Sequence, residues 1–229
     1  MINYRGLNIP RVSFGAVSSD DLFGALDQGV FDFYEANANR YRRALDIGAN
    51  IGVHSILMAK QGWDVRSYEP DPDHVRHALD NFVAHKVARG RLGTLAVSDY
   101  DGMETFVRVK GNTTGSHLKG DKQPYGELEE FDVQVVDCRP LFAWADFAKI
   151  DCEGHEARLL LTVRPENTCE FMVEVGNKAN AEAIYEHFMR MDVPMWTQKT
   201  NWHDVRTIHD MPQHHSEGGL FIGRERPFP

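Results

Sequence analysis

Short apolar runs recur along this chain, and longer stretches with an apolar side chain at every third or fourth position separate them. Runs of this length predict buried strands, and stripes of that spacing predict amphipathic helices. The apolar runs lie at residues 44–47, 65–69, 94–97, 148–151 and 171–175. Strands that alternate with helices are typical of a mostly parallel sheet covered on both faces. We therefore expect an α/β, doubly wound fold, closed by two further strands at 193–196 and 220–222.

Local signals mark where two of these helices begin and end. Gly62 follows the apolar stripe of residues 53–61 and is a typical C-terminal stop. Asp71 precedes Pro72, and an N-cap acid followed by proline at the first helical position predicts a helix start. The glycine-flanked strand before residue 53 and the strand before Asp71 are thus each followed by a helix.

No internal repeat and no linker divides the chain, so we expect one domain over residues 1–229. Residues 1–17 predict no firm element. The rest of residues 1–43 predicts a helical, lid-like segment, which precedes a core formed by residues 44–229. Residues 111–130 are polar and contain glycine, which is typical of a flexible loop beside a site.

The charge of the chain narrows the range of partners. Its 229 residues carry a formal net charge of -9 and a pI of about 5.6, which argues against broad electrostatic binding to nucleic acid or to an anionic membrane. The three cysteines are not arranged in pairs, which favours a reducing compartment over a disulfide framework. No apolar run approaches a membrane span. We expect a soluble, cytoplasmic protein.

The stretch from Ala44 to Ser55 predicts a strand, a tight turn and the first turn of a helix. Gly48 and Gly52 let the backbone bend and let a ligand approach without meeting a Cβ atom. The start of a helix also presents free N–H groups. Asp46 stands at the strand end, where an acid disfavours a pyrophosphate and attracts a cationic ligand. S-adenosylmethionine carries an ammonium and a sulfonium group and fits this loop.

A second acid stands at the end of the next strand. Glu69 lies about 20 residues beyond the glycine turn, where an acid reaches ribose hydroxyls in doubly wound folds. The loop departs from the dinucleotide pattern G-x-G-x-x-G, because Asn50 and Val53 occupy two of its glycine positions. An NAD-dependent dehydrogenase is disfavoured by that departure and by Asp46. An ordinary strand-to-helix turn with an exposed acid is the simpler alternative.

Four segments together resemble the FkbM-like class I methyltransferases, in the order of that family. They are Asp46–Gly52, Tyr68–Pro72, Ala96–Asp99 with Asp101-Gly102 after it, and Lys149–Glu156. The resemblance implies a seven-stranded sheet whose last strand runs antiparallel. It also implies S-adenosylmethionine as cofactor and methyl transfer to a hydroxyl of a sugar or natural product. The segment Asp137–Pro140 departs from the family pattern, which leaves the acceptor side open.

The resemblance and the strand ends indicate which residues hold the cofactor. The residues expected there are Asp46, Gly48, Asn50, Gly52, Glu69, Ser98 and Asp99. Asp46 would pair with the methionine ammonium, directly or through water, and Glu69 would take the ribose hydroxyls. The loop residues between them would shape the turn. Ser98 and Asp99 would lie at the adenine edge, although a plain turn explains them about as well.

Methyl transfer to a hydroxyl requires an acceptor oxygen in line with the sulfonium and removal of its proton. Asp151, Glu153 and His155 follow the fourth strand and are the candidate bases. Asp151 is the best placed by the resemblance, whereas His155 carries the side chain better suited to neutral pH. In the alternative, Asp151 only holds the cofactor and Glu153 only favours a helix N-terminus. Lys149 shares a strand face with Asp151, which indicates a structural ion pair.

The sequence thus predicts an S-adenosylmethionine-dependent O-methyltransferase acting on a small hydroxylated acceptor. Two alternatives stay open: N-methylation of an amino sugar, peptide or nucleic acid, and a non-catalytic cofactor-binding module. No metal is expected, because the spacing of His203, His209, His214 and His215 fits no standard zinc pattern. The absence of a basic stripe disfavours nucleic acid as the acceptor.

Overall fold

The computed structural model describes residues 1–88 and 91–228. Its largest sheet contains β3 (Arg43–Ile47), β4 (Asp64–Tyr68), β5 (Leu92–Gly93), β10 (Phe147–Ile150), β11 (Glu170–Glu174), β12 (Met195–Thr197), β13 (His203–Asp204) and β14 (Gly219–Ile222). The strand order is β13-β12-β14-β11-β10-β3-β4-β5. The five strands from β11 to β5 run parallel, and β14 runs antiparallel to both β11 and β12. The predicted doubly wound, mostly parallel sheet is confirmed, and so is the antiparallel last strand.

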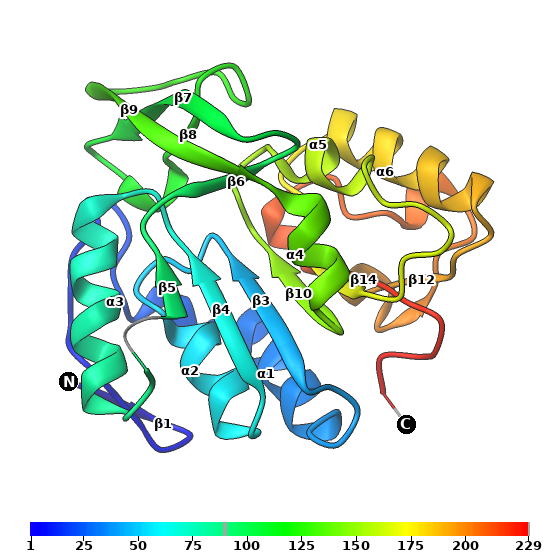
Figure 1. Cartoon of the computed structure of the whole chain (residues 1–229), viewed down its shortest axis with the longest axis horizontal. Coiled ribbons are helices and arrows are strands. Elements are labelled where there is room, and N and C mark those ends of the chain that lie inside the picture. Colours follow the sequence, from blue (N-terminus) through cyan, green and yellow to red (C-terminus); the bar gives the residue numbers. More distant parts are fainter. Residues whose placement is uncertain (89–90, 229) are drawn as a thin grey trace.

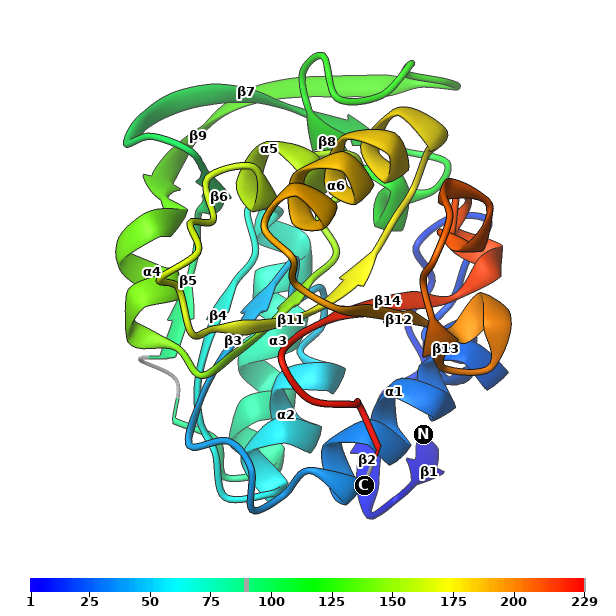
Figure 2. The ribbon, with the colours of Figure 1, turned by 90° about the vertical axis from the view of Figure 1, so that its right-hand side faces the viewer.

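Helices cover both faces of this sheet (Figure 1, Figure 2). One face carries α1 (Ala25–Ala36), α2 (Val53–Lys60) and α3 (Pro72–Ala84), and the other carries α4 (Cys138–Trp144), α5 (Glu156–Leu160) and α6 (Lys178–Arg190). The predicted signals are present: Asp71 accepts a hydrogen bond from the N–H of Asp73 at the start of α3. Gly62 follows α2 with a φ of 87°, in the left-handed region that favours glycine.

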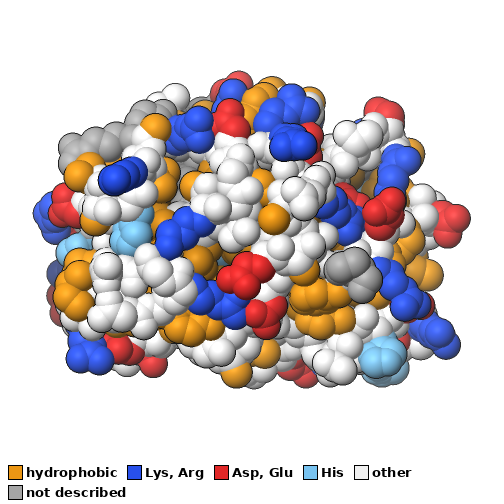
Figure 3. All heavy atoms as spheres, turned by 90° about the horizontal axis from the view of Figure 1, so that it is seen from below, with side chains coloured by type: hydrophobic (Ala, Val, Ile, Leu, Met, Phe, Trp, Pro, Cys, Tyr) orange, Lys and Arg blue, Asp and Glu red, His pale blue; other side chains and the backbone are white. Residues whose placement is uncertain are grey.

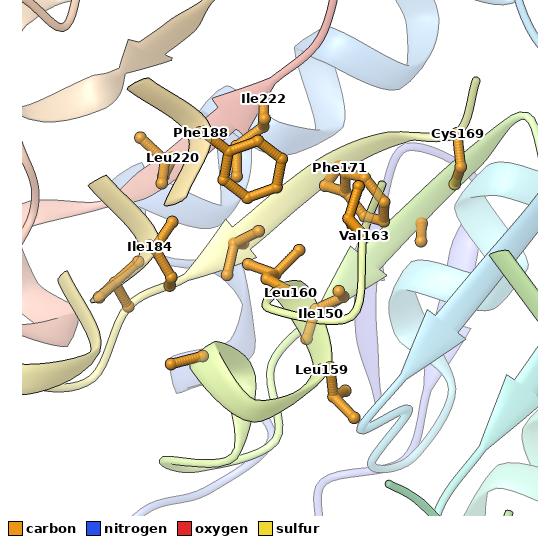
Figure 4. Close-up of a cluster of buried hydrophobic side chains, with 14 of the residues drawn as sticks. Ile150, Leu159, Leu160, Val163, Cys169, Phe171, Ile184, Phe188, Leu220 and Ile222 are labelled. Atoms are coloured by element: carbon orange, nitrogen blue, oxygen red, sulfur yellow. The ribbon is translucent and has the colours of Figure 1, made fainter. Parts of the chain in front are cut away.

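Two apolar clusters form the core, one on each side of the sheet. Because successive side chains of a strand point to opposite faces, Leu45 and Ile47 pack under α4, α5 and α6, whereas Ala44 packs under α1 and α2. Figure 4 shows the first cluster, where Ile184 and Phe188 of α6 lie over the strands. Burial on both faces explains the continuous apolar runs of these strands.

A second, four-stranded sheet lies across the carboxyl ends of the main strands (Figure 1, Figure 2). It contains β6 (Ala96–Ser98), β7 (Gly102–Val109), β8 (His117–Leu118) and β9 (Leu128–Asp137), in the order β6-β9-β7-β8. Arg108 of β7 donates two hydrogen bonds to Asp71, at 2.8 and 2.7 Å. This buried ion pair joins the second sheet to the start of α3.

Three sequence-based expectations differ from the structure. The main sheet has eight strands rather than seven, because the two-residue strand β13 adds to its edge. The run at 94–97 was expected to be the third core strand, but β6 pairs with β9 in the second sheet and β5 takes that place in the main sheet. Residues 111–130 are not a plain loop, since they contain β8, a 3-10 helix at Thr113–Gly115 and the start of β9.

The segment before the core is helical only in part. Residues 1–17, for which no element was expected, contain a hairpin of β1 (Ile2–Tyr4) and β2 (Leu7–Ile9). Its two turn residues both have positive φ, as a two-residue hairpin turn requires. A 3-10 helix at Asp21–Phe23 and then α1 follow, as the predicted helical part. Further 3-10 helices lie at Gln198–Thr200, Ile208–Asp210 and His215–Glu217.

The outer surface and the helix lengths bear on the expected partners. On the face in Figure 3, Lys and Arg side chains are interspersed with acidic and apolar ones. Among the described helices, none combines the length and the apolar character needed to cross a membrane.

Candidate active site

A cavity of about 530 Å³ opens at the carboxyl ends of the main strands, beneath the second sheet. Its walls come from the loop after β3 and the start of α2, the ends of β4, β10 and β11, the second sheet, the N-terminal segment, and the 3-10 helix at His215–Glu217. Open α/β sheets bind ligands at this end of their strands. The polar stretch 111–130 contributes to the wall, so its expected position beside the site is confirmed.

The glycine loop is shaped by close backbone approach. Gly48 has a φ of 79°, and a Cβ atom on it would lie 1.7 Å from the carbonyl oxygen of Asp151. Gly52 has a φ of 83°, and its Cβ would lie 2.5 Å from the ring of Phe82. Asn50 also lies in the left-handed region, with a φ of 50°. The loop therefore needs glycine at 48 and 52 for steric reasons, and Gly48 and Asn50 face the cavity.

Asp46 lies behind this loop rather than in the cavity wall. Its side chain is fully buried, and Ser55 of α2 donates a hydrogen bond to its Oδ2. Lys149 Nζ lies 3.9 Å from its Oδ1, which receives no hydrogen bond from the residues that the structure describes. Asp46 would therefore reach a ligand through water rather than directly.

Glu69 lies in the cavity wall at the end of β4. Its two carboxylate oxygens accept the N–H groups of Asn50, at 2.8 Å, and of Asp71, at 2.9 Å. Burial raises the pKa of Glu69 to about 7, although the two N–H groups act in the opposite direction. A carboxylate keeps further lone pairs after two such bonds, so Glu69 can still accept ligand hydroxyls.

Ser98 and Asp99 do not line the cavity. The Ser98 hydroxyl lies 3.1 Å from Nε2 of His155 and is fully buried. Asp99 accepts a hydrogen bond of 2.7 Å from Arg158 at the molecular surface. The neighbouring residues Ala96 and Val97 form the wall instead.

A buried lysine pairs with the carboxylate after β10 and lies among those at the ends of β3 and β11. Lys149 Nζ lies 3.1 Å from Asp151 Oδ2, so the predicted ion pair is present. Burial by itself lowers the pKa of Lys149, but the Asp151, Asp46 and Glu174 carboxylates outweigh it and keep the pKa above its ordinary value. Burial, together with Asp151, raises the pKa of Glu174 well above its ordinary range.

The two other candidate bases line the cavity but already have protein partners. Glu153 pairs with Lys122, and its φ of 55° is in the left-handed region. Nδ1 of the buried His155 lies 2.8 Å from Asp121, and its Nε2 contacts Ser98. The loop after β8 is thereby fastened to the turn after β10 at two points.

Several polar residues that face the cavity were not predicted from the sequence. Glu174 ends its strand as Asp46, Glu69 and Asp151 end or follow theirs, and that position was the available signal. His54, on the first turn of α2, lies 2.8 Å from the Tyr34 hydroxyl through Nδ1 and 3.8 Å from Asp27 through Nε2. These contacts join α1 to α2, so no sequence spacing reveals them.

The histidines near the C-terminus do not form one cluster. His215 lies in the cavity wall, whereas His203 contacts the carbonyl of Thr200 at the surface. Across residues 1–88 and 91–228, no three His, Cys, Asp or Glu side chains are grouped so that they could hold a metal ion.

Comparison with known proteins gives the family. The model of the methyltransferase FkbM domain matches residues 46–193. A search of curated proteins finds no match.

Similar solved structures extend over most of the chain at low identity. A precorrin-6y C5,15-methyltransferase from Geobacter metallireducens is 11% identical, with a TM-score of 0.45, over 89% of this chain and 93% of that one. The N-terminal domain of human METTL16, in complex with SAH, is 14% identical, with a TM-score of 0.47, over 96% of this chain and 75% of that one. An O-methyltransferase from Bacillus cereus, also in complex with SAH, is 11% identical, with a TM-score of 0.40, over 89% and 84%.

The matched range includes the glycine loop, the acid at the end of β4 and the Lys-Ile-Asp segment, which are the parts that form the cavity floor. The chain therefore belongs to the FkbM methyltransferase family and is a methyltransferase that depends on S-adenosylmethionine.

Proposed function

We propose that this protein transfers a methyl group from S-adenosylmethionine to a hydroxyl of a small acceptor, a sugar or another natural product. The observation that carries the proposal is a group of proton-accepting side chains in the cavity, beside the donor loop. Asp151 and His54 come from different elements and both line this one cavity. A hydroxyl needs such groups, because it must lose its proton as it attacks the methyl carbon.

The cavity residues fit the donor. The turn at Gly48 packs against the carbonyl of Asp151 and leaves no room for a side chain, and Gly48 lines the cavity, so its backbone forms part of the surface that a ligand meets. Glu69 lines the cavity at the end of β4, which supports the proposal that it accepts the ribose hydroxyls. Asn50 Oδ1 is buried without a hydrogen-bond donor among the described residues, and the ammonium of the methionine part is a suitable one. Asp46 adds negative charge behind the loop.

In this proposal Asp151 orients the acceptor and receives its proton. Lys149 Nζ lies 3.1 Å from one oxygen of Asp151, and the Asp151 side chain keeps 29% of its surface exposed. The bound donor supplies an electrophilic methyl group on its sulfonium. Positioning of the acceptor oxygen against that group contributes about 7–11 kcal/mol in well-oriented reactions. Glu153 and His155 also line the cavity, but Lys122 pairs with Glu153, and both ring nitrogens of His155 have partners in Asp121 and Ser98, so we assign them a structural role.

N-methylation of an amino sugar is the second candidate, and a specific observation favours it. Asp27 and Glu174 line one recess of the cavity together with His54 and His215. The Asp27 carboxylate attracts a cationic amine and repels phosphorylated or carboxylated acceptors. An amine attacks through its own lone pair once deprotonated, so the same side chains would serve it.

The experiment is a labelled methyl-transfer assay with paired acceptors. Each pair consists of a glycoside and its amino-sugar counterpart, incubated with donor and enzyme, and product mass and NMR locate the new methyl group. We expect methyl ethers, formed by the wild type and lost in Asp151→Asn. Methylation of the amines alone would favour the second candidate. Donor binding without transfer to any acceptor, even at high enzyme concentration, would favour a non-catalytic module.

A further inference from the structure

One histidine in the cavity wall has a ring nitrogen that its own surroundings leave without a partner. His117 of β8 is only 2% exposed and lies in the wall. Its Nδ1 lies 3.1 Å from the carbonyl oxygen of Gly115. Its Nε2 is buried and makes no hydrogen bond with any described residue. The other buried cavity histidines differ, since Nε2 of His74 lies 2.9 Å from Thr113 Oγ1 and Nε2 of His155 contacts Ser98.

The contact with Gly115 fixes which nitrogen carries the proton. A carbonyl oxygen can only accept, so Nδ1 must be the N–H donor. In the neutral ring, Nε2 then carries a lone pair and is an acceptor that lacks a donor. Leaving such an atom buried and unpaired costs about 1–3 kcal/mol. The position is therefore suited to a ligand that brings an N–H or O–H group.

The surroundings of His117 indicate which part of the ligand lies there. The second sheet also gives the cavity apolar wall residues, namely Ala96 and Val97 of β6, Phe106 of β7 and Leu118 of β8. Apolar walls with one polar atom suit a flat aromatic base. The segment shortly before His117 lies near Glu69, which marks the ribose, because His74 lies 3.9 Å from the Glu69 carboxylate and 2.9 Å from Thr113.

We propose that His117 Nε2 accepts a hydrogen bond from the exocyclic amine of the adenine ring and so selects an adenosyl donor. The inference rests on the proposed use of S-adenosylmethionine at this cavity. His117 takes the role at the adenine edge that the sequence suggested for Ser98 and Asp99, neither of which reaches the cavity.

The test compares S-adenosylhomocysteine with S-inosylhomocysteine, in which a carbonyl oxygen replaces the amine. Titration calorimetry on the full chain gives both affinities. The wild type should bind the adenosyl compound about ten- to a hundredfold more tightly, because the inosyl oxygen faces the Nε2 lone pair. In His117→Phe that ratio should fall to about threefold or less, with weaker binding of the adenosyl compound.

A second variant keeps the test independent of folding. In His117→Gln, the side-chain amide can turn to accept from the amine or donate to the inosyl oxygen, so both compounds should bind with similar affinity. His74→Gln is the matched control, since its ring already has a protein partner, and it should leave the ratio unchanged.

Three results would overturn the inference, in two different ways. A wild-type ratio near one, or a ratio that survives both substitutions at His117, refutes the role of His117 while donor binding stands. If the wild type binds neither compound, the assignment of the donor to this cavity fails as well.

Discussion

Two regions of the cavity are built differently. At the donor end, the turn from Gly48 to Gly52 and the acid Glu69 follow two adjacent strands, and the shape of the turn is set by backbone geometry. In the adjoining recess, Asp27, His54 and His215 come from three separate segments of the chain, and their side chains line one wall. A backbone-defined surface tolerates little change, whereas side chains on separate elements can be exchanged one at a time. One scaffold can thereby keep its donor while its acceptor varies.

The largest expected effect separates chemistry from donor binding. Asp151→Asn should lower the methylation rate about 100- to 10,000-fold, the range that removal of a general base produces. Its affinity for S-adenosylhomocysteine should change little, because Lys149 and the loop backbone stay in place. Rates and calorimetric affinities are measured on the same preparation. An equal loss of both would mean that Asp151 holds the donor.

His155→Gln is the comparison for that experiment. The contacts of His155 with Asp121 and Ser98 hold the cavity wall together, so the variant should have a lower melting temperature. Its methylation rate should fall less than that of Asp151→Asn. A rate loss as large as that of Asp151→Asn, without a change in melting temperature, would instead make His155 the base.

The next effect tests the backbone-defined end. Gly48→Ala should weaken binding of S-adenosylhomocysteine about 100-fold or more, because its Cβ would overlap the carbonyl of Asp151 and its φ is positive. Gly62→Ala is the control. Gly62 has a similar φ of 87° but no atom within 4 Å of the added Cβ, so only stability should fall, by about 1 kcal/mol. Equal binding by both variants would contradict the steric argument.

Features formed by residues close together in the sequence could be predicted, whereas features that depend on contacts between elements could not. The glycine turn and the Asp71 cap depend on residues a few positions apart, so the sequence reveals them. The placement of β6 does not, because a three-residue strand carries no mark of the sheet it joins. The pairing of His54 with Tyr34, and the buried nitrogen of His117, depend on contacts between elements.

Asp46 and Ser98 show the limit for site residues. Both stand at strand ends, where sequence position predicts a ligand contact, and yet both side chains are fully buried behind the wall. A strand end fixes where a residue lies along the sheet, whereas the direction of its side chain depends on the pleat and on its partners. Glu174 is the opposite case, because it lines the cavity from a strand end at which no site residue was predicted.

The smallest expected effect is the pH dependence that Glu69 causes. A rise in pH should lower the stability of the free protein but raise its affinity for the ligand. The pKa of Glu69 is raised to about 7 in the folded chain, so the folded state takes up a proton relative to the unfolded one. The stability that this group contributes is therefore present below its ordinary pKa and is lost as the pH rises toward 7. Ribose hydroxyls need the ionised carboxylate as acceptor, so binding should follow the opposite course.

Affinity for S-adenosylhomocysteine should fall by up to about tenfold from pH 8 to pH 6, because at pH 6 only about a tenth of the Glu69 carboxyl groups are ionised. Calorimetry across this range measures the slope, and thermal melts without ligand measure the stability. Glu69→Gln should flatten both curves, since the amide does not titrate. If the wild-type affinity is constant over this range, or if the variant keeps the same slope, binding of the ribose does not depend on Glu69. The donor end of the cavity would then consist of the glycine turn alone.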